Sequence, residues 1–201
     1  MPQITRRALT AGLACAAVTC TTPGFAAARP TRYVLDPNRS TVAFSYRLNG
    51  TPSSGTMPVT RADIVVDPEN LSASQVDVSV SVARARTGLV FVTQALKSAE
   101  VLDAARFPEV RFVSESVALA ANGRLSDGAT ITGRVTLRGV TRRLSFRANV
   151  YRQPGSAAND LENLTVQLTG AISRSAFGAS GFANYVDDEV TLDIQAAIRA
   201  A

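Results

Sequence analysis

The side chains that could do chemistry are scarce in this chain. Its 201 residues contain no histidine, the side chain that most often acts as a general base near neutral pH and that commonly ligates zinc, copper or haem iron. Both cysteines, Cys15 and Cys20, lie in an N-terminal segment that we expect to be removed, so the mature chain should hold no disulfide and no thiolate metal site. Met57 is then the only soft side chain left for haem iron, and we predict no metal site and no cofactor.

Two groups of residues could still serve an enzyme. Asp187, Asp188 and Glu189 form the densest acidic cluster, and Lys97 adjoins Ser98. Catalysis would need paired carboxylates in a cleft or a nucleophile beside its activating base. An acidic run at the start of a strand is instead typical of a solvated turn, and neighbouring residues of a helix do not face each other. We therefore predict that the protein is not an enzyme.

Five segments alternate apolar and polar residues almost without a break. They are the elements that must position whatever site the chain has. Successive side chains of a strand point to opposite faces, so each segment has one apolar face and one wet face. A sheet of this kind must close or stack around its apolar face, and such an interior suits a container for an apolar molecule better than a catalyst. The apolar residues are Val76, Val78, Val80 and Val82; Ile131, Val135 and Leu137; Leu144, Phe146, Ala148 and Val150; Leu164, Val166, Leu168 and Ile172; and Val190, Leu192, Ile194 and Ile198.

Turn-forming residues divide the chain after residue 30 into eight expected strands, of which the first has two short pieces. The residues from Asn49 to Gly55 are dense in helix and strand breakers and are predicted to form a loop. Between the third and fourth strands, apolar residues recur at helical spacing, so one short helix is expected over 92–102. The strands are expected at 33–36 with 41–49, 56–66, 75–82, 109–119, 129–137, 142–151, 162–173 and 189–198.

The N-terminus is typical of an export signal. Thr5–Leu9 resembles a twin-arginine start, and the apolar run Ala8–Val18 is followed by small residues suited to cleavage. This run is shorter than the roughly 18 residues that span a bilayer. We predict a signal peptide over 1–28, cut after Ala28, and one periplasmic domain over 29–201. Twin-arginine export and general secretion are both compatible with the sequence.

The charge of the chain bears on its partners. The formal net charge is +5, and the arginines of the mature chain are scattered along the polar faces of the expected strands rather than clustered. A nucleic-acid site would cluster them and interleave aromatic residues for stacking, so none is predicted. Transient contact with an anionic membrane surface is compatible with this charge, and a homodimer is compatible with the sequence.

Several segments, taken in order, resemble the YceI-like family. They are Tyr33–Asp36 with Ser40–Phe44, Ala95–Ser98 with Leu102 and Asp103, Phe107–Phe112, Gly133–Arg142 and Ser173–Gly178. The similarity spans about residues 31–199. It implies an all-β fold: an eight-stranded antiparallel lipocalin-like barrel, with the short helix between the third and fourth strands.

The resemblance also implies a non-catalytic, exported carrier with an elongated apolar pocket for a polyisoprenoid, an isoprenoid quinone or a similar lipid. Family members often carry a histidine where this chain has Arg39 and another where it has Ala95, so we expect a more apolar entrance. The Gly133–Arg142 segment is predicted to form a hairpin in which Gly139 supplies a positive φ. Val135 and Leu137 are expected to lie opposite Leu144 and Phe146 across it. Arg174 is expected to be a structural arginine at the surface.

The predicted ligand contacts are apolar residues of the strands and of the region around the helix. Those of the strands are expected to line the lumen, and those near the helix its mouth. An eight-stranded barrel can equally be filled by its own side chains, so a structural or stress-related module without a ligand is the alternative. The predicted contacts are Phe44, Val80, Val82, Phe112, Val135 and Phe146 in the lumen and Leu89, Phe91 and Leu96 at the mouth.

Overall fold

The fold is known from a computed structural model, which describes residues 30–67, 70–120, 127–157 and 160–201. The predicted signal peptide, with Cys15 and Cys20, lies outside the described residues. Among the described residues, no helix is both long and apolar enough to cross a membrane.

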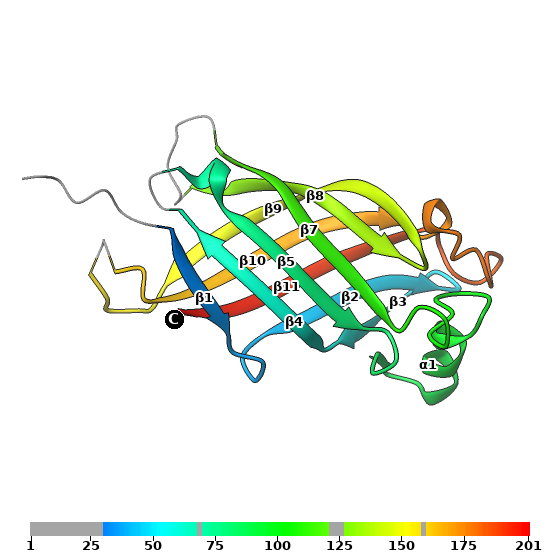
Figure 1. The fold of residues 1–201 in the computed structure, drawn as a ribbon. Helices are drawn as coiled ribbons and strands as arrows, with labels where there is room; N and C mark the ends of the chain where they lie inside the picture. The colour runs from blue at the N-terminus through cyan, green and yellow to red at the C-terminus, as the bar shows by residue number, and fades with distance from the viewer. Residues whose placement is uncertain (1–29, 68–69, 121–126, 158–159) are drawn as a thin grey trace, which may run out of the picture.

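The described residues form one antiparallel sheet of eleven strands (Figure 1). Eight of the strands close into a barrel, because β1 pairs with β4 on one side and with β11 on the other. The strands β2, β3 and β6 extend this sheet from β11. The bounds are β1 Thr31–Leu35, β2 Thr41–Leu48, β3 Thr51–Met57, β4 Val59–Val66, β5 Gln75–Ser81, β6 Arg86–Thr87, β7 Glu109–Leu119, β8 Ala129–Leu137, β9 Val140–Arg152, β10 Asn163–Ser173 and β11 Glu189–Ala200.

The prediction of a closed, eight-stranded antiparallel barrel is confirmed, but the prediction that 49–55 form a loop is wrong. Asn49 and Gly50 have φ of 51° and 74° and join β2 to β3, with Leu48 opposite Thr51. Two consecutive positive φ angles give a tight turn whose twist matches that of its strands, and Asn-Gly is the sequence that favours it most. The breakers therefore make a hairpin, and β3 continues where a loop was expected.

A second tight turn joins β8 to β9. Gly139 has the predicted positive φ, 74°, but Arg138 beside it is also left-handed, with φ 50°. The two-residue turn sets Val135 opposite Arg142 and Leu137 opposite Val140. The predicted pairing with Leu144 and Phe146 is therefore wrong, because a two-residue turn makes the hairpin tighter than we assumed.

The helix α1 spans Val90–Lys97, so it begins two residues before the predicted start and ends five residues before the predicted end. It follows β6 rather than the third strand of the barrel, and its predicted place between the third and fourth strands is wrong. The error has two causes: β3 and β6 were not expected as separate strands, and residues 98–108 form turns. Apart from two short 3-10 helices, Leu71–Ala73 and Ser175–Phe177, α1 is the one helix among the described residues, and it lies at one end of the barrel (Figure 1).

Two buried clusters hold the barrel. The first contains Phe146, Phe177 and Leu102 and lies toward the end that carries α1. The second contains Tyr33, Ile64, Leu164 and Ile198, at the meeting of β1, β4, β10 and β11. Burial raises the pKa of Tyr33, whose hydroxyl donates to the carbonyl of Leu161 at 2.8 Å. The space between these clusters is the interior of the barrel.

On the outer face, Arg111 of β7 binds the carboxylate of Asp77 of β5 with two hydrogen bonds, of 2.9 and 2.6 Å. These bonds hold the pKa of Asp77 below its usual range, and partial burial opposes them. We expect Asp77→Asn to lower the free energy of unfolding at pH 7 by about 0.5 kcal/mol, as is typical of partly exposed pairs. A carboxylate whose pKa is lower in the folded state stabilises the fold at pH values above its unfolded-state pKa of about 3.9. This stabilisation is lost as the pH falls through the folded-state pKa. The difference in stability between the two proteins in urea denaturation should therefore shrink as the pH falls below about 3.9.

Candidate ligand-binding site

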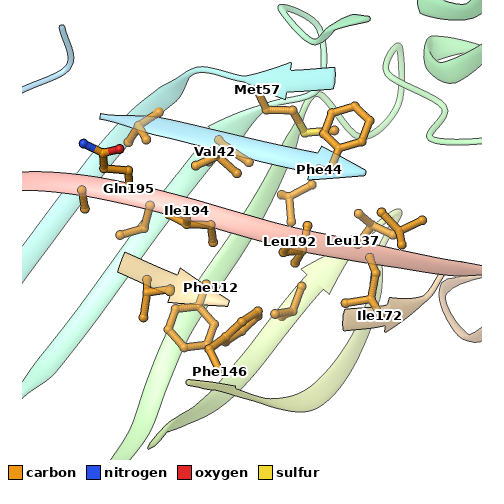
Figure 2. Close-up of a pocket in the computed structure, with 18 of the residues that line it drawn as sticks. Val42, Phe44, Met57, Phe112, Leu137, Phe146, Ile172, Leu192, Ile194 and Gln195 are labelled. Atoms are coloured by element: carbon orange, nitrogen blue, oxygen red, sulfur yellow. The ribbon is translucent and has the colours of Figure 1, made fainter. Parts of the chain in front are cut away.

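A cavity of about 670 Å³ runs inside the barrel. Its walls are the inward side chains of the strands, as Figure 2 shows for residues of β2, β7, β9, β10 and β11. On β5, for example, Val76, Val78 and Val80 all line it, at every second position. The alternation of apolar and polar residues is thus the local cause of the cavity, because it gives each strand one apolar face and the closed sheet turns those faces inward.

Most of the predicted contact residues share this cavity. They are Phe44, Val80, Phe112, Val135 and Phe146 of the strands and Phe91 and Leu96 of α1. Phe112 and Phe146 meet edge to face, with ring centroids 5.5 Å apart. The structure thus gathers residues from five strands and the helix around one space, and their contact with a ligand stays a prediction.

Val82 and Leu89 do not line the cavity, so their predicted placement is wrong. Val82 follows the last residue of β5, its N–H donates to the carbonyl of Pro108 at 2.9 Å, and it is packed in the first buried cluster. Leu89 precedes α1, is half exposed and lines a separate small hollow with Tyr46 and Leu48. Both residues lie where the strand has ended, so the alternation that orients strand residues no longer applies to them.

The segment from Arg174 to Val186 also lines the cavity, which the alternation of apolar and polar residues does not predict. It contributes Arg174, Ala179, Gly181, Phe182, Tyr185 and Val186. The N–H of Gly181 donates to the carbonyl of Glu100 at 3.0 Å, which ties this segment to the residues after α1. This segment has neither strand nor helix periodicity. Only the pair of aromatic residues at 182 and 185 marks it in the sequence as a possible part of an apolar site.

Arg174 is a structural residue, as expected, but it is buried rather than at the surface, with 7% of its area exposed. Its guanidinium donates to four carbonyls: to Asp187 at 3.1 Å, to Val186 at 3.0 Å, and to Ala179 and Gly181 at 2.7 Å each. The planar guanidinium suits such a task, because its donors diverge in a fixed fork. Arg174 therefore holds the loop that forms one wall of the cavity mouth.

Hydroxyl groups also lie near the mouth. Burial raises the pKa of Tyr46, and a hydrogen bond with Thr87 opposes that rise. The hydroxyl of Thr87 also lies 2.8 Å from that of Thr93 and donates to the carbonyl of Leu89 at 2.9 Å. In the described part of the chain, no three histidine, cysteine, aspartate or glutamate side chains gather where they could hold a metal ion. The site can therefore offer apolar contact along most of its length, with a few polar groups in its lining.

Solved structures of similar shape share this barrel. The crystal structure of BcnA from Burkholderia cenocepacia has a TM-score of 0.71 at 20% identity and covers 82% of this chain and 99% of its own. A polyisoprenoid binding domain from Saccharophagus degradans, implicated in plant cell wall breakdown, has a TM-score of 0.62 at 14% identity and covers 85% of this chain and 99% of its own. At these identities the similarity shows the fold.

Sequence comparison identifies the family. Protein YceI from Salmonella arizonae is 34% identical over 87 residues, which is 43% of this chain and 43% of that protein. The curated relatives are thus matched over less than half of their length. The family model of the YceI-like domain matches residues 33–198, which include every strand from β2 to β10 and most of β1 and β11. This chain belongs to the YceI-like family.

Proposed function

We propose that the protein is a non-catalytic periplasmic carrier that holds a long-chain apolar ligand, a polyisoprenoid or a similar lipid, in the lumen of the barrel. The observation that carries the proposal is the cavity of about 670 Å³ with an apolar lining. Its volume lies in the range of about 300–1,000 Å³ that is usual for small-molecule sites. The predicted signal peptide and the family support the periplasmic location.

The cavity also bears on the alternative, a structural module with a filled lumen. Eight strands make an interior that side chains can just fill. Here the inward residues are mainly valine, leucine, isoleucine and alanine, with no tryptophan anywhere in the chain, and they leave the space open. The polyisoprenoid binding domain of S. degradans, which shares the fold, supports a ligand of the same class.

Affinity should depend on chain length in a way that tests this function. Each buried CH₂ group contributes about 0.8 kcal/mol, or about fourfold in affinity. For delipidated protein and isoprenoid alcohols of graded length, we expect affinity to climb steeply until the cavity is full and then to level off. Phe112→Trp should move that plateau to shorter chains with little loss of stability. Isothermal titration or displacement of a fluorescent lipid measures both curves.

A filled interior would give the opposite result. Phe112→Trp would then overpack the core and lower the free energy of unfolding by roughly 1–3 kcal/mol, and wild type would bind no long-chain amphiphile saturably. That pair of results would reject the carrier and leave the structural module.

The mouth of the cavity suggests how a lipid is exchanged. Leu89, Val90, Phe91, Phe182 and Tyr185, which we call the mouth patch, are 42–77% exposed. Phe91, Phe182 and Tyr185 line the cavity as well, so the lumen reaches the surface through the patch, at the end of the barrel that carries α1 (Figure 1). Exposed Arg84 and Arg86 immediately precede it. We propose that the mouth patch rests on a lipid bilayer, with these cations near anionic head groups.

Val90 provides a clean test of the bilayer contact. It is 77% exposed and does not line the cavity, and an aspartate at the first position of a helix is favourable. We expect Val90→Asp to reduce binding to vesicles of phosphatidylcholine and phosphatidylglycerol about tenfold, because the burial of one valine side chain is worth about 1.5 kcal/mol. Val34→Asp, on β1 and 49% exposed, is the matched control. Equal vesicle flotation of the two variants would argue against the mouth patch.

A further inference from the structure

Three glycines occupy inward positions of the sheet that surrounds the cavity: Gly55 on β3, Gly133 on β8 and Gly170 on β10. Each alternates with cavity-lining residues of its own strand, such as Met57, Val135 and Leu168. None of the three has a positive φ. Because their backbone is of a kind that any residue adopts, the need for glycine must come from the space where a side chain would point.

In each case a phenylalanine ring from a nearby strand lies in that space, and at Gly55 and Gly133 a backbone carbonyl lies there as well. A Cβ atom on Gly133 would lie 2.6 and 2.7 Å from Cε2 and Cζ of Phe112, and one on Gly170 would lie 2.6 and 3.0 Å from Cδ1 and Cε1 of Phe146. A Cβ atom on Gly55 would overlap Cζ of Phe44, its direct cross-strand partner. All three rings line the cavity (Figure 2).

The pairing of ring and glycine decides where the ring lies. A phenylalanine at an inward position of a small barrel would otherwise project toward the axis, where it would narrow the lumen. Over a glycine, the ring can lean sideways onto the bare backbone of the neighbouring strand. Phe44 and Phe146 are only 6% and 5% exposed although they border the cavity, as expected for rings that lie against the wall.

We infer that Gly55, Gly133 and Gly170 determine ligand specificity by setting the bore of the lumen. By holding three rings against the wall, they keep the lumen wide enough for a chain with methyl branches, such as an isoprenoid, rather than only for a linear acyl chain. This inference rests on the proposed function for the identity of the ligand. Its structural part, that the glycines hold the rings aside, stands independently of any ligand.

Gly170 is the position at which the inference can be tested without damage to the backbone. A Cβ atom there would meet the Phe146 ring closely but would keep an ordinary distance of 3.5 Å from the carbonyl of Ser145. At Gly55 and Gly133 the added atom would also overlap carbonyls, those of Arg86 and Val113. A side-chain ring can rotate away where a strand carbonyl cannot, so Gly170→Ala should fold and displace Phe146 into the lumen.

The experiment is a double-mutant cycle of Gly170→Ala, Phe146→Leu and the two together. For Gly170→Ala we expect affinity for an isoprenoid alcohol to fall roughly 10- to 200-fold, the range found for one methylene in an apolar pocket. A linear alcohol of equal carbon number should lose much less. The double variant should recover isoprenoid binding, because leucine has no ring to displace. Gly88→Ala, where nothing lies within 4 Å, is the control and should bind like wild type.

A crystal structure of Gly170→Ala tests the position of the ring without any ligand. We expect the Phe146 ring to have moved toward the barrel axis and the cavity to be smaller. A ring left in place, or an equal loss for branched and linear chains, would overturn the inference. If wild type binds neither class of chain, the proposed carrier fails, while the position of the ring still decides whether the glycine sets the bore.

Discussion

Arg174→Met is expected to unfold at a much lower urea concentration than wild type. The substitution removes the four hydrogen bonds that the guanidinium donates to the carbonyls of residues 179, 181, 186 and 187. A buried acceptor left without a donor costs roughly 1–3 kcal/mol, and these four are not equally buried. We expect a total loss of about 3 kcal/mol or more, measured as a shift of the urea midpoint.

The control is Arg142→Met, the same substitution at an exposed arginine that donates one hydrogen bond, of 3.2 Å, to the carbonyl of Ala176. It should change stability by less than about 1 kcal/mol. Arg174→Lys should fall between the two, since an ammonium keeps the charge but cannot match the fork of donors. Equal midpoints for the two methionine variants would mean that water replaces the guanidinium at the carbonyls, and that the loop does not depend on Arg174.

Val80→Asp is expected to have the second large effect. Val80 is 8% exposed, lines the cavity and lies between Val59 of β4 and Val110 of β7. A carboxylate at this position would face the apolar lumen without a partner, which we expect to lower the free energy of unfolding at pH 7 by about 3 kcal/mol or more. Binding of any apolar chain should be lost with it. Urea denaturation and lipid titration measure the two effects.

The pH dependence separates a buried charge from a simple change of shape. Desolvation should raise the pKa of the introduced carboxyl, so the deficit in stability should shrink as the pH falls below that value and the group becomes neutral. Thr130→Asp, at an exposed position of β8 opposite Arg147, should remain close to wild type throughout. A deficit for Val80→Asp that is constant from pH 4 to pH 8 would show that the loss comes from the change of shape and not from a buried charge.

The alternation of residue types predicted the barrel strands well because it is a local property. It placed Val76, Val78 and Val80 on the inner face correctly, since burial on one side of a sheet enforces a period of two. It failed where a turn decided the outcome: Asn49 and Gly50 were read as breakers although they build a hairpin. It also failed on the outer face of β5, where Ser79 and Ser81 are buried rather than wet.

The site was predictable only where strands form it. Five strand residues and two helix residues of the prediction line the cavity, whereas the wall made by Arg174 and the loop after it depends on contacts between distant parts of the chain. The role of the inward glycines could not be predicted, because a glycine inside a strand is normally expected to destabilise it. Its purpose becomes clear only when the ring that covers it is known. Tertiary contacts of this kind leave no periodic trace in a sequence.

The pairing of β1 with β11 governs how fast the molecule can fold. It joins Tyr33 to Ala200, so the first and last described strands must meet before the barrel closes. Sheets dominated by such distant pairings fold slowly, on the order of milliseconds to seconds. Until β11 arrives, β10, β1 and β2 have open edges and the apolar faces of the other strands are bare, a state prone to edge-to-edge aggregation. Newly made chains are therefore most vulnerable during the interval before their last twelve-residue strand is in place.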